Sequence, residues 1–105
     1  MMTFYYVVAA QAFMESEPLD EVLEERVRNY NEREKAIDFA YVTAPACFET
    51  APLAERVTTL DKPLAAVISS DQNFIRWLKL RLEFVDMGEF EAESLEAASC
   101  SVQVA

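Results

Sequence analysis

The residue types that most often perform chemistry near neutral pH are sparse in this sequence. It contains no histidine, which is the commonest acid/base residue in that range and the commonest nitrogen ligand of zinc, iron and copper. A di-iron carboxylate site built from Glu-x-x-His motifs is therefore impossible, and the segment EVLEER (residues 21–26) offers only half of that motif. The single glycine, Gly88, excludes GxGxxG and phosphate-binding loops, which need several glycines. We expect no metal site and no bound cofactor.

Carboxylates and thiols remain as candidate catalytic groups, and each has a simpler structural explanation. Cys47 has no histidine partner and is expected to be a small buried residue rather than a nucleophile. Ser70 and Asp71 precede a helical pattern and suit helix capping. An acidic cluster lies at a predicted helix N-terminus, where the helix dipole favours acids on a solvated face. Its members are Glu15, Glu17, Asp20, Glu21, Glu24 and Glu25. We therefore expect a protein that is not an enzyme.

Length and charge narrow the class of protein further. The 105 residues suit one domain, which we expect over residues 1–92, followed by a flexible tail over residues 93–105, where the sequence is small and polar without a period. The net charge of −10 argues against nucleic acid or anionic lipid as general partners, because binding them usually needs a basic surface.

The expected compartment follows from the cysteines and from the absence of targeting patterns. Cys47 and Cys100 show no CxxC spacing, so we expect free thiols in a reducing, cytoplasmic compartment. No apolar run approaches the ~20 residues that span a bilayer, and we expect neither a signal nor a transit peptide.

Hydrophobic periodicity predicts alternating strands and helices, hence an α/β (α+β) domain. Strand patterns cover residues 4–13, 37–42 and 64–68, and EFEAE (residues 89–93) could form a short edge strand. Helical patterns cover residues 19–34, 50–60 and 71–85. Arg26 and Arg33 lie at the edge of an apolar arc, where we expect their stems along the core and their charges paired with carboxylates. Gly88 follows the last helical pattern, where a positive φ is often needed.

The helix predicted over residues 71–85 has two apolar arcs, which is one more than a single sheet can cover. At about 100° per residue, one arc faces a core. It contains Phe74, Ile75, Leu78, Leu82 and Val85. The second arc contains Trp77, Leu80 and Phe84, with Arg81 between the two arcs. Either another element of this chain or a partner protein must cover Trp77 and Phe84.

Three segments resemble one known family over residues 3–92. They are MESEPLDEVLEERVRNY (residues 14–30), IDF (residues 37–39) and AAVISSDQNFIRWLKLRLEFVDMGEFEA (residues 65–92). The chain resembles the hypothetical chloroplast reading frame fifty-four family of cyanobacteria and plastids. That family is the accessory subunit of the oxygen-dependent magnesium-protoporphyrin IX monomethyl ester cyclase of chlorophyll biosynthesis.

The resemblance implies both a fold and a role in photosynthetic cells. The fold is a small sandwich, with about three helices packed on a three- to four-stranded, largely antiparallel sheet. The role is non-catalytic: the protein binds the membrane-associated di-iron catalytic subunit and supports its assembly or activity, near protochlorophyllide reductase and other chlorophyll-synthesis enzymes. Association with thylakoid membranes would then be peripheral and through these partners.

A protein-binding surface is the leading hypothesis, because aromatic residues beside an arginine are typical of interface hot spots. The predicted contact residues are Asp38, Phe39, Trp77, Arg81 and Phe84. Each also has a structural alternative: the aromatic residues could be core, and Asp38 and Arg81 could form a structural ion pair. An exposed apolar helix face could equally be covered in a homodimer.

Two other classes of function remain open at this stage. The first is a carrier that holds a tetrapyrrole, the cyclase substrate or product, in an aromatic pocket. That pocket would lie near Tyr5, Tyr6, Tyr41 and Trp77. The second is an enzyme that uses carboxylates alone, which would require a pocket with a strongly perturbed Asp or Glu.

Overall fold

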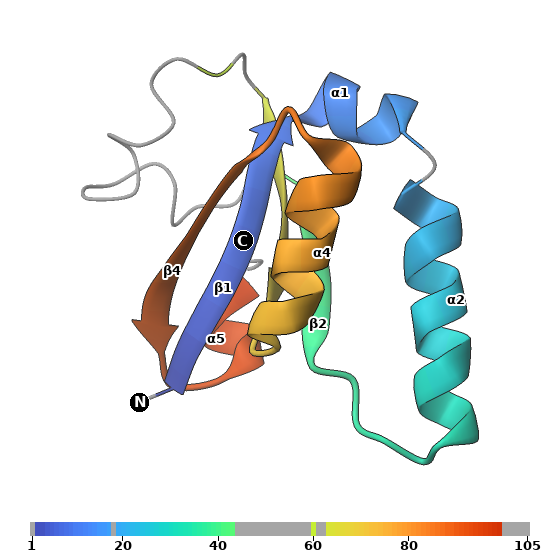
Figure 1. Ribbon diagram of the computed structural model, residues 1–105. Helices are drawn as coiled ribbons and strands as arrows, with labels where there is room; N and C mark the ends of the chain where they lie inside the picture. The colour runs from blue at the N-terminus through green and yellow to red at the C-terminus, as the bar shows by residue number, and fades with distance from the viewer. Residues whose placement is uncertain (1, 18, 44–59, 61–62, 100–105) are drawn as a thin grey trace.

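The computed structural model describes residues 2–17, 19–43, 60 and 63–99 (Figure 1). Within this part, four strands form one sheet in the order β2-β3-β1-β4, and every neighbouring pair is antiparallel. The strands are β1 (Met2–Ala10), β2 (Phe39–Thr43), β3 (Leu64–Ser69) and β4 (Asp86–Ala92). The described helices are α1 (Gln11–Ser16), α2 (Leu19–Glu32), α4 (Gln72–Leu82) and α5 (Leu95–Ser99). The predicted α+β class with an antiparallel sheet is confirmed.

Strand β1 lies between β3 and β4 and is buried on both faces, which explains its nearly continuous apolar sequence. Val7 and Ala9 face the side on which α4 packs. Phe4, Tyr6 and Val8 face the other side, in a second core that includes part of α5. Figure 1 shows α4 across one face of the sheet, α2 beyond it, and α5 on the opposite face. The sheet therefore separates two apolar cores.

The inner arc of α4 is packed as the periodicity predicts. All five residues of that arc are buried against the sheet. The carboxylate of Asp71 caps the helix, because it accepts hydrogen bonds from the backbone N–H groups of Asn73 (3.0 Å) and Phe74 (3.3 Å). At the other end, the Lys79 ammonium donates to the carbonyls of Glu83 (3.1 Å) and Val85 (2.7 Å). Both ends of α4 are thus fixed.

Three predicted boundaries lie three residues from the observed ones. The strand predicted over residues 4–13 ends at Ala10, and α1 begins at Gln11, whose N–H donates to the Pro63 carbonyl at 2.8 Å. An apolar run without a clear period suits a buried strand and a buried helix equally. The helix predicted over residues 71–85 ends at Leu82, because Glu83 takes a positive φ of 59°, and the strand predicted over residues 89–93 begins at Asp86. By contrast, α2, β2 and β3 lie within two residues of their predictions.

Gly88 does not end a helix, contrary to the sequence expectation. The residue with positive φ at the end of α4 is Glu83 (φ 59°), whereas Gly88 lies inside β4 opposite Tyr6 of β1. A Cβ atom at position 88 would lie 2.5 Å from the Tyr6 hydroxyl oxygen and 2.7 Å from Cζ. Gly88 is needed for this close approach of a tyrosine ring rather than for its backbone angles.

The expected flexible tail is partly helical. Residues 95–99 form α5, and Ala98 is completely buried in the second core. Ser94 starts this helix, since its hydroxyl accepts a hydrogen bond from the N–H of Ala97 (3.1 Å) and its carbonyl accepts one from Ala98 (2.8 Å). The predicted helix over residues 50–60 and both cysteines, Cys47 and Cys100, lie outside the described residues, apart from residue 60.

No helix in the described part of the chain is long and apolar enough to cross a bilayer.

We predict that Gly88→Ala destabilises the fold by about 2 kcal/mol, because the new methyl group must displace the buried Tyr6 ring. Urea unfolding followed by circular dichroism measures the change. Glu91→Ala, at an exposed position of the same strand, is the matched control and should change stability by less than about 0.5 kcal/mol. Equal stability of Gly88→Ala and wild type would contradict this explanation of the glycine.

Candidate protein-binding site

The second apolar arc that the sequence predicts is exposed in the described structure, although only Trp77 and Leu80 of its members lie on α4 and Phe84 follows its end at Leu82. The exposed fractions are 48% for Trp77, 77% for Leu80 and 78% for Phe84. Phe84 has one aromatic neighbour, Phe13, whose ring it meets edge-on at a centroid distance of 6.4 Å. The sequence leaves two alternatives for this arc, coverage by another element of the chain or by a partner protein. Among the described residues, no other element covers it. We call the surface formed by Trp77, Leu80 and Phe84 the α4 stripe.

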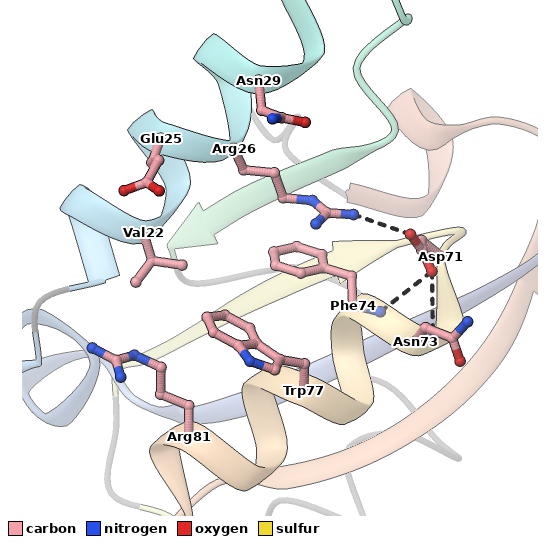
Figure 2. Close-up of a pocket in the computed structure, with 9 residues that line it drawn as sticks. All are labelled: Val22, Glu25, Arg26, Asn29, Asp71, Asn73, Phe74, Trp77 and Arg81. Atoms are coloured by element: carbon pink, nitrogen blue, oxygen red, sulfur yellow. Dashed lines mark hydrogen bonds and ion pairs between the residues drawn. The ribbon is translucent and has the colours of Figure 1, made fainter. Parts of the chain in front are cut away.

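An open groove of about 660 Å³ lies between α2 and α4, next to the α4 stripe (Figure 2). Trp77 stacks on Phe74 with a centroid distance of 6.4 Å and an interplanar angle of 19°. The guanidinium of Arg81 lies 5.9 Å from the centre of the Trp77 ring. The lining residues are Val22, Glu25, Arg26, Asn29, Asp71, Asn73, Phe74, Trp77 and Arg81. The groove thus has an aromatic wall on α4 and a mostly polar wall on α2.

Arg26 joins the two walls of the groove. Its guanidinium lies 3.7 Å from the centre of the Phe74 ring and donates hydrogen bonds to Asp71 Oδ2 (3.0 Å) and the Tyr30 hydroxyl (2.7 Å). Figure 2 shows the side chain reaching from α2 over Phe74 to the start of α4. The expectation that Arg26 pairs with a carboxylate at the rim is confirmed, whereas Arg33 is exposed and forms no ion pair with another described residue. Its role in joining α2 to α4 was missed, since the sequence does not indicate which carboxylate it meets.

A hydrogen bond from Tyr30 holds Asp38. The Tyr30 hydroxyl donates to Asp38 Oδ1 at 2.8 Å, and Lys35 Nζ lies 3.9 Å from Asp38 Oδ2. Burial raises the pKa of Tyr30 above its ordinary value, and the hydrogen bond to Asp38 raises it further, whereas the charge of Arg26 acts in the opposite direction. The neutral tyrosine is therefore the form that this arrangement favours.

The structure does not bring the five predicted contact residues into one patch. Trp77 and Arg81 lie on α4, Phe84 lies just beyond its end, and Arg81 is exposed. Asp38 lies near the start of α4, because its carbonyl accepts a hydrogen bond from Ser70 (3.2 Å) and its carboxylate is held by Tyr30. The alternative of an Asp38–Arg81 ion pair is therefore not realised.

Phe39 corrects the sequence expectation most clearly. It is only 6% exposed, and its ring packs edge-on against Tyr30 (5.6 Å) and Phe74 (5.5 Å). A partner could reach it only after the core rearranged. Phe39 therefore supports Phe74 and the base of the groove from beneath instead of forming part of the surface.

The four aromatic residues of the carrier hypothesis do not share a pocket. Tyr5 and Tyr41 pack on the face that carries α4, whereas Tyr6 lies in the core on the opposite face. Tyr41 lines a separate open groove beside α2. Among the described residues, no group of three or more Cys, Asp and Glu side chains could hold a metal ion.

Comparisons with known proteins point to one family. The profile of the Ycf54 protein family matches residues 2–92. A Ycf54-like protein from Synechocystis sp. is 47% identical over 95 residues, which cover 90% of this chain and 71% of the relative. The chloroplastic protein YCF54 of Arabidopsis thaliana is 37% identical over 101 residues, which cover 93% of this chain and 46% of the relative.

Solved structures agree with these sequence relatives. The crystal structure of Ycf54 from Thermosynechococcus elongatus is similar with a TM-score of 0.82 and 49% identity, and the match covers 85% of this chain and 84% of that one. A protein structure from Nostoc sp. is similar with a TM-score of 0.87 and 45% identity, over 99% and 97% of the two chains.

We predict that the raised pKa of Tyr30 appears in the pH dependence of stability. The pKa of Tyr30 is higher in the folded protein than its unfolded value of about 10. The protonated tyrosine therefore stabilises the fold fully below pH 10, and this stabilisation is lost as the pH rises beyond that value. Tyr30→Phe should lower the free energy of unfolding by about 1–2 kcal/mol at pH 7. Above pH 10, the free energy of unfolding of this variant should fall less steeply with pH than that of wild type. Urea unfolding from pH 7 to 11 measures this. Parallel curves for the two proteins would contradict it.

Proposed function

This chain belongs to the Ycf54 family, and from that premise we propose that it is a non-catalytic accessory subunit of the magnesium-protoporphyrin IX monomethyl ester cyclase in chlorophyll biosynthesis. In this role it binds the di-iron catalytic subunit and supports its assembly or activity. The reaction chemistry belongs to that subunit, so the role requires no catalytic group from this chain.

The α4 stripe is the observation that carries the proposal. Large apolar side chains at 48–78% exposure are costly to leave in water and are typical of a surface that a partner covers. Trp77 with Arg81 beside it has the composition of an interface hot spot. Because α4 is packed and capped, binding loses little backbone freedom, which favours affinity.

The proposal also includes where in the cell the protein acts and which enzymes lie near it. Relatives in cyanobacteria and in the Arabidopsis chloroplast support a role in photosynthetic cells and plastids. We place the protein at thylakoid membranes only through its partners. Protochlorophyllide reductase and other chlorophyll-synthesis enzymes are candidate neighbours in that assembly.

A pull-down from solubilised photosynthetic membranes tests this function. Tagged wild type should retain the di-iron catalytic subunit, whereas Trp77→Ala and Arg81→Ala should retain about tenfold less, because each removes a hot-spot side chain. Thermal melting must show that both variants remain folded. Arg28→Ala, at an exposed position of α2, is the matched control and should bind normally.

Two results would contradict the proposal in different ways. A wild-type protein that retains no catalytic subunit would show that the function is wrong. Folded Trp77→Ala and Arg81→Ala variants that bind like wild type would show that the contact surface lies elsewhere.

A further inference from the structure

Helix α4 is locally basic in a strongly acidic protein. Its eleven residues include Arg76, Lys79 and Arg81 and no acid, whereas the whole chain has a net charge of −10. The Lys79 ammonium is occupied by the carbonyls of Glu83 and Val85. Arg76 and Arg81 are exposed, and neither forms an ion pair among the described residues. The outward charge of the helix is thus carried by two arginines.

The two arginines flank the α4 stripe. At about 100° per residue, Arg76 and Arg81 lie on either side of Trp77 and Leu80 on the helix. Phe84 follows just beyond the end of α4, after Glu83, whose φ of 59° is not helical. Figure 2 shows Trp77 and Arg81 on the side of α4 that faces α2. Arg76 lies on the other side, where it lines a small cavity beside β4. The α4 stripe is therefore an apolar surface with one arginine on each side.

We infer that the α4 stripe binds an acidic amphipathic helix of the partner protein. The apolar residues of such a helix would cover Trp77, Leu80 and Phe84, and its carboxylates would lie next to Arg76 and Arg81. Trp77 and Leu80, three residues apart on α4, have the spacing of contacts between two helices. The inference rests on the proposed function, because it takes the di-iron catalytic subunit as the partner and names the kind of segment that binds.

Charge makes other occupants of the stripe less suitable. In a two-fold dimer through α4, the two helices would bring four arginines together, and Glu83, just after each helix, is the only acid between Arg76 and Phe84. An anionic membrane surface would attract Arg76 and Arg81 but would repel a protein with a net charge of −10. An acidic segment of a protein meets the local positive charge and also covers the α4 stripe.

Photo-crosslinking from the stripe identifies the occupant directly. Leu80 is replaced by p-benzoylphenylalanine, the tagged full chain is irradiated in solubilised photosynthetic membranes, and the crosslinked peptide is mapped by mass spectrometry. We expect a crosslink to the di-iron catalytic subunit, in a peptide with helical apolar periodicity and more Asp and Glu than Lys and Arg. The same replacement at Val27, an exposed apolar position on α2, is the matched control and should give no such crosslink.

Charge reversal supplies a second, independent measurement. Arg76→Glu should reduce retention of the catalytic subunit about tenfold, and the reduction should be smaller at high salt. Arg28→Glu changes the net charge of the chain by the same amount away from the stripe and should bind like wild type. Equal binding by both variants would overturn the inference.

The outcomes separate this inference from the proposed function. If wild type retains the catalytic subunit but Leu80 crosslinks to a basic segment, to a second copy of this chain or to lipid, the inference is wrong and the proposed function stands. If wild type retains no catalytic subunit, the retention assay itself shows that the proposed function is wrong, and the inference is overturned with it.

Discussion

The arrangement of α2 and α4 depends on the contact of Arg26 with Phe74 and Asp71. Only Leu19 and Tyr30 of the fourteen residues in α2 are buried, so apolar packing alone gives this helix little attachment. The Arg26 guanidinium lies 3.7 Å from the centre of the Phe74 ring and pairs with Asp71 at 3.0 Å. A cation over an aromatic ring gains most where water is partly excluded, as in this groove. Because Asp71 also caps α4, one contact positions α2 and the first turn of α4 together.

The inner and outer faces of α4 serve different purposes, and the second depends on the first. The inner arc packs on the sheet, and Phe39 supports Phe74 from beneath, so the helix cannot rotate without opening the core. The outer residues Trp77 and Leu80 are therefore held at fixed spacing although they are exposed. A preorganised apolar surface of this kind reduces the entropy lost on binding. The long-range charge of the protein is negative, so the positive charge of α4 acts only at short range.

Local features were predictable from the sequence, whereas features that join distant segments were not. The buried and exposed faces of α4 and its Asp71 cap follow from helical spacing and from neighbouring residues, and the structure agrees with them as far as Leu82, where the helix ends before Phe84 and Val85. The sequence suggests a helix end at Gly88, whereas the glycine is required by the ring of Tyr6 on another strand, which no local pattern shows. For Phe39 the sequence leaves both a contact residue and a core residue open, because its burial arises from two aromatic rings on other elements. Arg26 meets a carboxylate 45 residues away, which no local pattern encodes.

The central claim is that a partner covers the outer face of α4, and the single tryptophan of the chain allows a direct test. Trp77 labelled as 5-fluorotryptophan gives one protein resonance in the fluorine NMR spectrum, because the sequence has no other tryptophan. Our account predicts that unlabelled di-iron catalytic subunit shifts or broadens this resonance and protects Trp77 from a soluble paramagnetic quencher. An unchanged resonance with undiminished quenching, in a sample where complex formation is demonstrated by size-exclusion chromatography, would contradict it.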